Sequence, residues 1–157
     1  MSDDSLPDFV DLKKRYMALP PGPKAEIRRV RDPDELAMIP AVYRLLPPGQ
    51  RLTDPWQRVL FLLPYVRHRD GEATLGQALA HARISEMRVF QMIRSEDQTI
   101  ALQHLRRLCQ HVEPTVNWQQ FGRTLFFWGD KARQRIVEDY FISGGGKSPA
   151  RQTKEKA

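Results

Sequence analysis

The sequence predicts an all-α protein, a compact helical bundle of about eight or nine helices. Apolar residues recur at spacings of three and four, as in the series Trp56, Val59, Leu60 and Leu63. Residues that favour helix starts stand in front of such runs. No stretch alternates apolar and polar residues strictly enough to predict a half-buried strand.

Helix-start signals divide the chain into elements. A carboxylate followed by proline supplies an N-cap acceptor and a first-turn residue whose missing N–H is not needed there. A capping box pairs the N-cap side chain with a glutamine three residues later. The signals are Asp32-Pro33, Asp54-Pro55, Thr74 with Gln77, and Asn117 with Gln120. The predicted helices span residues 8–18, 23–30, 33–46, 55–68, 75–82, 86–94, 97–112, 118–127 and 130–142.

Length and composition set the domain organisation. A chain of 157 residues with 41% hydrophobic content suits one domain, or two small sub-bundles that share a core and meet near residue 70. We expect an acidic N-terminal segment over 1–11, the helical domain over 12–142 and a disordered basic tail over 143–157. The single cysteine, Cys109, excludes an internal disulfide, and no signal peptide or spanning segment is evident, so we expect a cytoplasmic protein.

The positive charge is unevenly distributed. The chain has a net charge of +6, and residues 13–69 carry twelve basic against five acidic side chains. Arginine outnumbers lysine eighteen to seven, and its planar fork suits bidentate contacts with phosphate. A polyanionic partner is therefore expected. The alternative that many arginines pair within the fold stays open.

The sequence contains no convincing catalytic or metal-binding constellation. The histidines lack metal-ligand spacing, and the adjacent carboxylates Glu138 and Asp139 point in different directions on a helix. We therefore expect no enzymatic activity, no metal and no cofactor.

The stretch "TLGQALAHARISEMRVFQMIR", residues 74–94, resembles a helix-turn-helix. We expect Met87, Phe90 and Ile93 to form its buried stripe, with Arg88 and Arg94 on another face. A second helix that starts with an acid and a core methionine is poorly suited to reading bases. This weakens the alternative of a DNA-binding transcription regulator of the helix-turn-helix class, which stays open because Ser85 and Arg88 can still reach a groove. A basic protein-binding scaffold that contacts no nucleic acid is a third alternative.

Three collinear blocks carry a wider resemblance. The blocks "EIRRVRDPDELAMIPAVYRLL", "TLGQALAHARISEMRVFQMIR" and "ALQHLRRLCQHVEPTVNWQQFGRTLFFWGDKARQRIVEDYF" resemble the CasB family, the small subunit of the type I-E CRISPR surveillance complex Cascade. The resemblance covers about residues 12–142. It implies a non-catalytic, all-helical subunit that helps to hold an R-loop open in antiviral defence, particularly the displaced strand.

The resemblance also implies partners and site residues. The implied partners are the guide RNA, the target and non-target DNA strands, the backbone and large subunits of the complex, and a second copy of the chain. A subset of the basic residues in the three blocks is expected to contact phosphates. These residues are Arg28, Arg29, Arg44, Arg83, Arg88, Arg94, Arg106, Arg107, Arg123, Lys131, Arg133 and Arg135.

The aromatic and aliphatic residues of the last block have a different predicted role. Trp118, Phe121, Leu125 and Trp128 recur at helical spacing, which favours a place in the core over a base-stacking platform.

Overall fold

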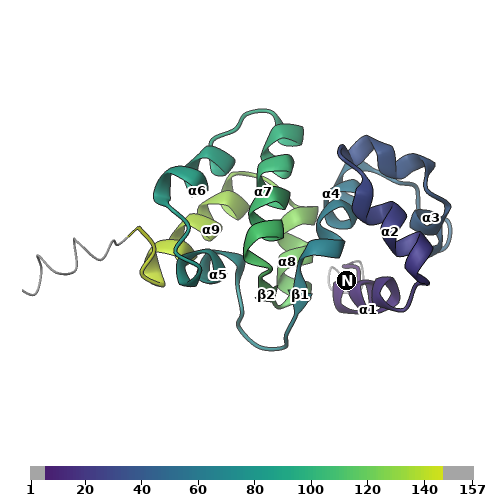
Figure 1. The fold of residues 1–157 in the computed structure, drawn as a ribbon, viewed down its shortest axis with the longest axis horizontal. Helices are drawn as coiled ribbons and strands as arrows, with labels where there is room; N and C mark the ends of the chain where they lie inside the picture. Colours follow the sequence, from purple (N-terminus) through teal and green to yellow (C-terminus); the bar gives the residue numbers. More distant parts are fainter. Residues whose placement is uncertain (1–5, 147–157) are drawn as a thin grey trace, which may run out of the picture.

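Short helices make up most of the computed structural model, which describes residues 6–146 (Figure 1). The first half contains α1 (Phe9–Met17), α2 (Pro21–Arg29), the 3₁₀ helix η2 (Pro33–Met38), α3 (Pro40–Leu45), α4 (Asp54–Leu62) and the 3₁₀ helix η3 (Leu63–Tyr65). The second half contains α5 (Leu75–His81), α6 (Glu86–Ile93), α7 (Gln98–Val112), α8 (Trp118–Phe126) and α9 (Asp130–Ile142). The predicted all-α fold is confirmed.

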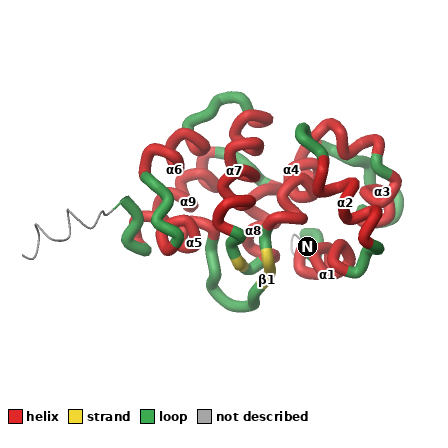
Figure 2. The backbone as a smooth tube through the Cα atoms, viewed as in Figure 1, coloured by secondary structure: helices red, strands yellow, loops and turns green. Residues whose placement is uncertain are grey.

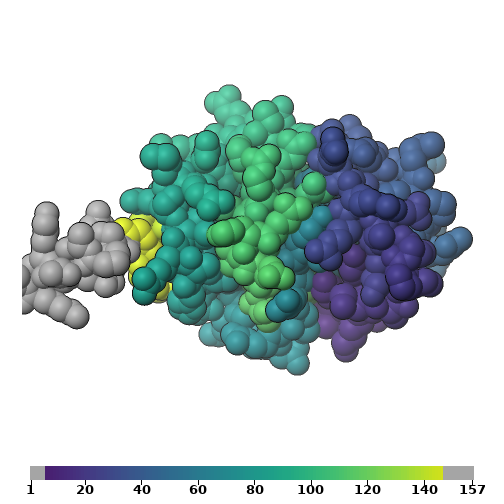
Figure 3. Space-filling model, viewed as in Figure 1, coloured from purple at the N-terminus to yellow at the C-terminus, as the bar shows by residue number. Residues whose placement is uncertain are grey.

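The helices form two groups that meet at α7 and α8. In Figure 1, α1, α2 and α3 lie at one end of the molecule, and α5, α6 and α9 lie at the other. Helix α5 packs along α9 and α6 packs against α7, while both α1 and α4 pack against α8. Figure 3 shows the residues of α7 in the middle of one face, between the two groups.

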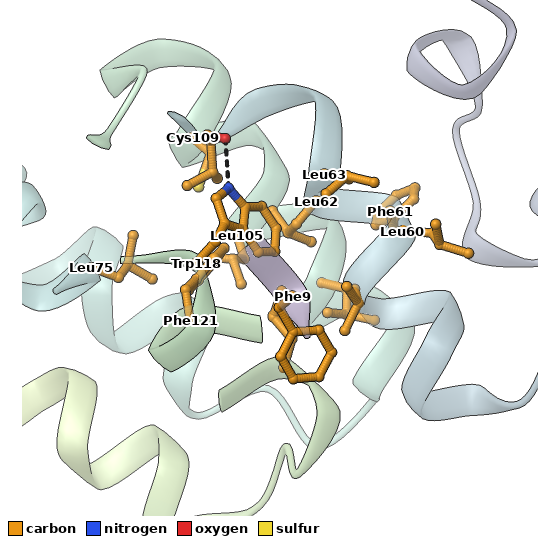
Figure 4. Packing of buried hydrophobic residues seen from close by; sticks show 14 of the residues in the cluster. Phe9, Leu60, Phe61, Leu62, Leu63, Leu75, Leu105, Cys109, Trp118 and Phe121 are labelled. Atoms are coloured by element: carbon orange, nitrogen blue, oxygen red, sulfur yellow. Dashed lines mark hydrogen bonds between the residues drawn. The ribbon is translucent and has the colours of Figure 1, made fainter. Parts of the chain in front are cut away.

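A short parallel pairing of strands joins the two halves. Strand β1 (Arg67–His68) pairs with β2 (Thr115–Val116), as the yellow segments of Figure 2 indicate. The indole Nε1 of Trp118 donates to the carbonyl oxygen of Val66 at 2.8 Å (Figure 4), and the Trp118 backbone N donates to His68 Nδ1 at 3.0 Å. The sequence did not predict these strands, because two residues are too few to show an alternating pattern.

Buried apolar side chains form a cluster that draws on both halves of the chain, from Phe9 to Tyr140. Trp118, Phe121, Leu125 and Trp128 all belong to it, which confirms their predicted place in the core. Burying each large side chain contributes about 1.5–3 kcal/mol, so this cluster is the main source of stability. The sub-bundle boundary near residue 70 stays a prediction.

Prolines shorten two of the predicted helices. The residue before a proline is driven out of the helical region, and Ile39, before Pro40, is extended at φ −104° and ψ 113°. The single helix predicted over 33–46 is therefore wrong, and η2 and α3 replace it. The helix predicted over 55–68 ends at Leu62, and Pro64 lies in the following 3₁₀ turn.

The predicted caps are largely confirmed. Thr74 Oγ1 accepts from Gln77 N at 3.3 Å, and Thr74 N donates to the Gln77 amide oxygen at 3.5 Å, which completes the predicted capping box. Asn117 caps α8, but its Oδ1 accepts from Gln119 N at 2.9 Å and not from Gln120. Helix α4 starts one residue earlier than predicted, at Asp54, so its N-cap is Thr53 and the N-cap predicted at Asp54 is wrong.

Two buried cations bind carbonyl oxygens at the ends of helices. Arg58 is only 8% exposed, and it donates to the carbonyl oxygens of Leu125 at 2.6 Å and Phe126 at 2.7 Å, at the end of α8. Lys13 is 7% exposed and donates to the carbonyl oxygen of Leu63 at 2.7 Å, just after α4. Burial lowers the pKa of the Arg58 guanidinium. Each cation satisfies an acceptor that a helix end leaves without a partner.

Helices α5 and α9 approach closely at Gly76. A Cβ atom at this position would lie 2.7 Å from the backbone N of Tyr140, and it would also meet the carbonyl oxygen of Ile136. Only glycine permits this contact without a shift of α9.

We expect Gly76→Ala to destabilise the protein by about 1–3 kcal/mol, because the added methyl group forces the two helices apart. The melting temperature would fall by several degrees, as circular dichroism can measure. Gly22→Ala is the matched control, because a Cβ at Gly22 in α2 meets nothing within 4 Å. An equal melting temperature for Gly76→Ala and the unmodified protein would contradict this account of the helix contact.

Candidate nucleic-acid interface

Three of the predicted cations line one depression between α5, α8 and α9. Arg123 lies on α8, and Lys131 and Arg135 lie on α9. The depression has a volume of about 610 Å³ and is also lined by Phe127, Thr124 and Asp139. We call it the C-terminal hollow.

The amphipathic pattern of α8 and α9 directs these cations outward. Trp118, Phe121 and Leu125 bury one face of α8, which leaves Arg123 exposed on another. Ile136 and Tyr140 anchor α9 in the same way, and Lys131 and Arg135 are exposed. The sequence pattern thus accounts for where each cation points.

An exposed aromatic ring completes the C-terminal hollow. Phe127 is 55% exposed, and its ring packs edge-on to Phe126 at 5.2 Å between centroids. Sequence reasoning missed this residue among the surrounding core aromatics. The available signal was its place outside the stripe formed by Trp118, Phe121 and Leu125. A partly exposed ring among cations is the arrangement on which single-stranded bases stack.

The C-terminal hollow carries an excess of positive charge. Its lining contains three cations and one carboxylate, Asp139. None of the three cations forms an ion pair within residues 6–146. Such a surface attracts a phosphate chain regardless of sequence.

Two of the predicted contact residues are instead engaged inside the fold. Arg106 donates to the carbonyl oxygen of Val30, and its guanidinium lies 4.4 Å from the centroid of the Phe61 ring. Burial is the main cause that lowers the pKa of Arg106. Arg133 donates to the carbonyl oxygens of Ile93 and Ser95, each at 3.2 Å. Both guanidinium groups therefore connect helices, which leaves the other predicted cations for contacts with a partner.

The remaining predicted residues are exposed but scattered over the molecule. Arg94 is the C-cap residue of α6, and its guanidinium carbon lies 4.8 Å from the centroid of the Phe90 ring. It also lines a second depression between α6 and α7. Arg83 adopts a left-handed backbone at φ 60°. The other exposed residues of this set are Arg28, Arg29, Arg44, Arg88 and Arg107.

The predicted buried stripe of α6 is wrong in register. Val89 and Met92 are the buried residues, whereas Met87 is 79% exposed. Apolar residues occur at so many positions of this short helix that two stripes fit the pattern, and contact with α7 and α9 selects one of them. Ser85, Arg88 and Met87 are thus all exposed at the start of α6. Helices α5 and α6 pack mainly on α9 and α7, respectively, and not on each other as in a helix-turn-helix.

Few of the cations are neutralised by carboxylates. The one ion pair between charged side chains among the described residues is Arg67 with Glu113 at 3.3 Å. His68 accepts from Trp118 N at its Nδ1, so it is neutral and its Nε2 donates a hydrogen bond to Asp70 at 2.8 Å. Where arginines are engaged inside this part of the chain, their hydrogen-bond acceptors are mostly backbone carbonyl oxygens. The exposed arginines therefore keep their charge available to a partner.

Residues 6–146 contain no group of three or more His, Cys, Asp or Glu side chains arranged to hold a metal ion. The helices in this region are also too short or too polar to cross a bilayer. Cys109 is buried, and burial raises the pKa of its thiol.

Comparison with known proteins gives consistent results. The family model described as CRISPR-associated protein Cse2 matches residues 23–141. The Escherichia coli K12 protein named CRISPR system Cascade subunit CasB is 38% identical over 151 residues, which cover 87% of this chain and 94% of that protein. A chain in the crystal structure of E. coli Cascade bound to a PAM-containing double-stranded DNA target superposes with a TM-score of 0.80 at 40% identity, covering 87% of this chain and 95% of that one.

Arg106 and Arg107 are neighbours on α7, and replacing each in turn tests whether hydrogen-bonded arginines stabilise the fold more than exposed ones do. We expect Arg106→Ala to destabilise the protein by about 1–3 kcal/mol, because the Val30 carbonyl loses a charged donor. Its melting temperature would fall by about 3–10 °C. Arg107→Ala should change stability by less than about 0.5 kcal/mol, because Arg107 is exposed. Equal melting temperatures for the two variants would show that Arg106 has no structural role.

Proposed function

The chain belongs to the CRISPR-associated Cse2 family, and from this membership we propose that it is the small, non-catalytic subunit of a Cascade surveillance complex. In that complex its basic surface holds nucleic-acid backbone and stabilises the R-loop, above all the displaced DNA strand. It acts in antiviral defence in the cytoplasm.

The observation that carries this proposal is the set of exposed cations without carboxylate partners. Within the described residues, a single arginine, Arg67, forms an ion pair with a carboxylate. Unneutralised cations release counterions from a phosphate chain when they bind it, and this release drives sequence-independent association. A displaced strand can have any sequence, so a sequence-independent mode of binding suits it.

The C-terminal hollow is the best-formed place for such contacts. Arg123, Lys131 and Arg135 offer donors to consecutive phosphates, and Phe127 offers a ring for a base. Base stacking contributes about 1–3 kcal/mol per base and tolerates any base.

Modest contacts suffice for the proposed role. Formation of an R-loop exchanges a DNA duplex for an RNA–DNA hybrid of similar stability, so contacts with the backbones decide the balance. The partners that we propose are the guide RNA, the target and non-target strands, the backbone and large subunits, and a second copy of this chain. The similarity to a chain of E. coli Cascade bound to double-stranded DNA supports this choice.

The proposal predicts a salt-dependent interaction with single-stranded DNA. Replacing Arg123, Lys131 and Arg135 by glutamine should weaken binding of two unrelated single strands equally. The slope of log K against log salt should become shallower by about two, at roughly 0.7 for each phosphate that the variant no longer neutralises. Arg51→Gln is the control for the loss of a surface charge, because Arg51 is exposed and lines neither the C-terminal hollow nor the depression between α6 and α7. Fluorescence anisotropy across a salt series measures both quantities.

The same triple variant should shorten R-loop lifetimes in a reconstituted complex without changing assembly. Unchanged salt slopes and R-loop lifetimes would refute the role of the C-terminal hollow. A strong preference of the unmodified protein for one duplex sequence would instead favour a transcription regulator that uses the exposed start of α6.

A further inference from the structure

A further depression, lined by several cations, lies between the first two helices and the end of α7. Its lining includes Lys13 and Lys14 on α1, Arg28 on α2, Tyr65 in η3, Arg67 in β1 and Glu113 directly after α7. Its volume is about 770 Å³, which is within the usual range for small-molecule sites. We call it the N-terminal cavity, and it shares no lining residue with the C-terminal hollow.

The N-terminal cavity concentrates positive charge that the fold leaves largely uncompensated. Four cations line it, and the one carboxylate in its lining is Glu113. Glu113 pairs with Arg67 at 3.3 Å, but both side chains are about two-thirds exposed, so water screens this pair strongly. No acidic side chain in the described residues pairs with Lys13 or Arg28.

The ammonium group of Lys13 has unused hydrogen-bonding capacity. Lys13 is 7% exposed, and the one hydrogen bond that its Nζ makes within residues 6–146 is to the carbonyl oxygen of Leu63. An ammonium group has three N–H donors. Burial, followed by the charges of Arg67, Lys24 and Arg28, lowers the pKa of Lys13 to about 8. A buried cation next to further cations is unfavourable until an anion joins them.

We propose that the N-terminal cavity binds a phosphate group, carried by a nucleotide or by a nucleic-acid strand, through Lys13, Arg28 and Arg67. Phosphate oxygens accept several charge-assisted hydrogen bonds at once, which suits a cavity whose lining includes these three cations. Lys14 lies at the exposed rim and adds to the attraction. Where the phosphate belongs to a strand, this inference rests on the proposed function and adds a separate surface to it.

The remaining lining suits the apolar part of such a ligand. Met17, Pro64 and Tyr65 contribute to the wall, and Met17 is 55% exposed. Arg28 already lies against Tyr65, with its guanidinium carbon 5.4 Å from the ring centroid. The cavity thus joins a cationic site to an apolar wall, as a nucleotide requires.

Calorimetric titration of the full-length protein at low salt tests the proposal. The probes are thymidine monophosphate and an oligothymidylate, and the variants are Lys13→Met and Arg28→Met. We expect either substitution to weaken binding about tenfold or more, the effect of losing one charge-assisted hydrogen bond. Arg28 is exposed, so its replacement leaves the fold intact even where Lys13→Met does not. Arg51→Met is the control for the loss of one surface charge.

Proton uptake gives an independent measure of contact with Lys13. A bound phosphate favours the charged ammonium and raises the pKa of Lys13, so binding near pH 8 takes up protons. The binding enthalpy should then vary with the ionisation heat of the buffer, and Lys13→Met should remove this variation. On α1 and α2, the titratable and charged groups around Lys13 are Lys14, Tyr16, Lys24 and Arg28. The groups on its other sides are Tyr65, Arg67, His68, Cys109 and Glu113.

The outcomes separate the two sources of phosphate. If both probes bind and both are weakened by the variants, the cavity accepts a free nucleotide. If only the oligothymidylate behaves in this way, the phosphate belongs to a strand. Variants that bind both probes as tightly as the unmodified protein, or an unmodified protein that binds neither probe, would overturn the inference. If oligothymidylate binding is lost when Arg123, Lys131 and Arg135 are replaced by glutamine, but is unchanged in Lys13→Met and Arg28→Met, the proposed function is supported and this inference is refuted.

Discussion

The structure depends on one constraint: the carbonyl oxygens at the C-terminal ends of its short helices need hydrogen-bond donors. Each such end leaves acceptors without intrahelical partners and carries partial negative charge. Here cations from distant parts of the chain satisfy them. Lys13 reaches the residue after α4, Arg15 the end of α3, Arg58 the end of α8, Arg106 the residue after α2 and Arg133 the end of α6. A fold of many short helices has many such ends, and this requirement accounts for part of the arginine content.

This use of cations divides the basic residues into two kinds. Arg106 and Arg133 connect helices, and their charge is partly balanced by carbonyl dipoles. The second kind is exposed to solvent and comprises Arg123 on α8 with Lys131 and Arg135 on α9. Net charge alone therefore overstates the binding surface, and burial with hydrogen bonding identifies the residues that remain available.

The sequence predicted the helices well, because the apolar spacing and the caps are local signals. The helix breaks at Pro40 and Pro64 are also local signals. They were not predicted because the apolar spacing continues across both prolines and favours unbroken helices. The strand pair and the role of Arg106 were not predictable in this way. Arg106 binds a carbonyl 76 residues away, and a backbone carbonyl has no signature in a sequence. For the same reason, nothing in the sequence indicates that Lys13 and Arg67 line one cavity.

The docking of α1 on α8 makes folding depend on residues that lie far apart in the sequence. Phe9 N donates to the Gln119 amide oxygen at 2.9 Å, and Gln119 Nε2 donates to the Pro7 carbonyl at 3.0 Å. Gly122 leaves room for the Phe9 ring, since a Cβ there would lie 2.6 Å from Phe9 Cβ. Helix α1 is synthesised well before α8, so the part of its apolar face that packs on α8 stays uncovered until α8 has been made. Contacts of such long range slow folding, because residues 110 positions apart must meet before this contact can form.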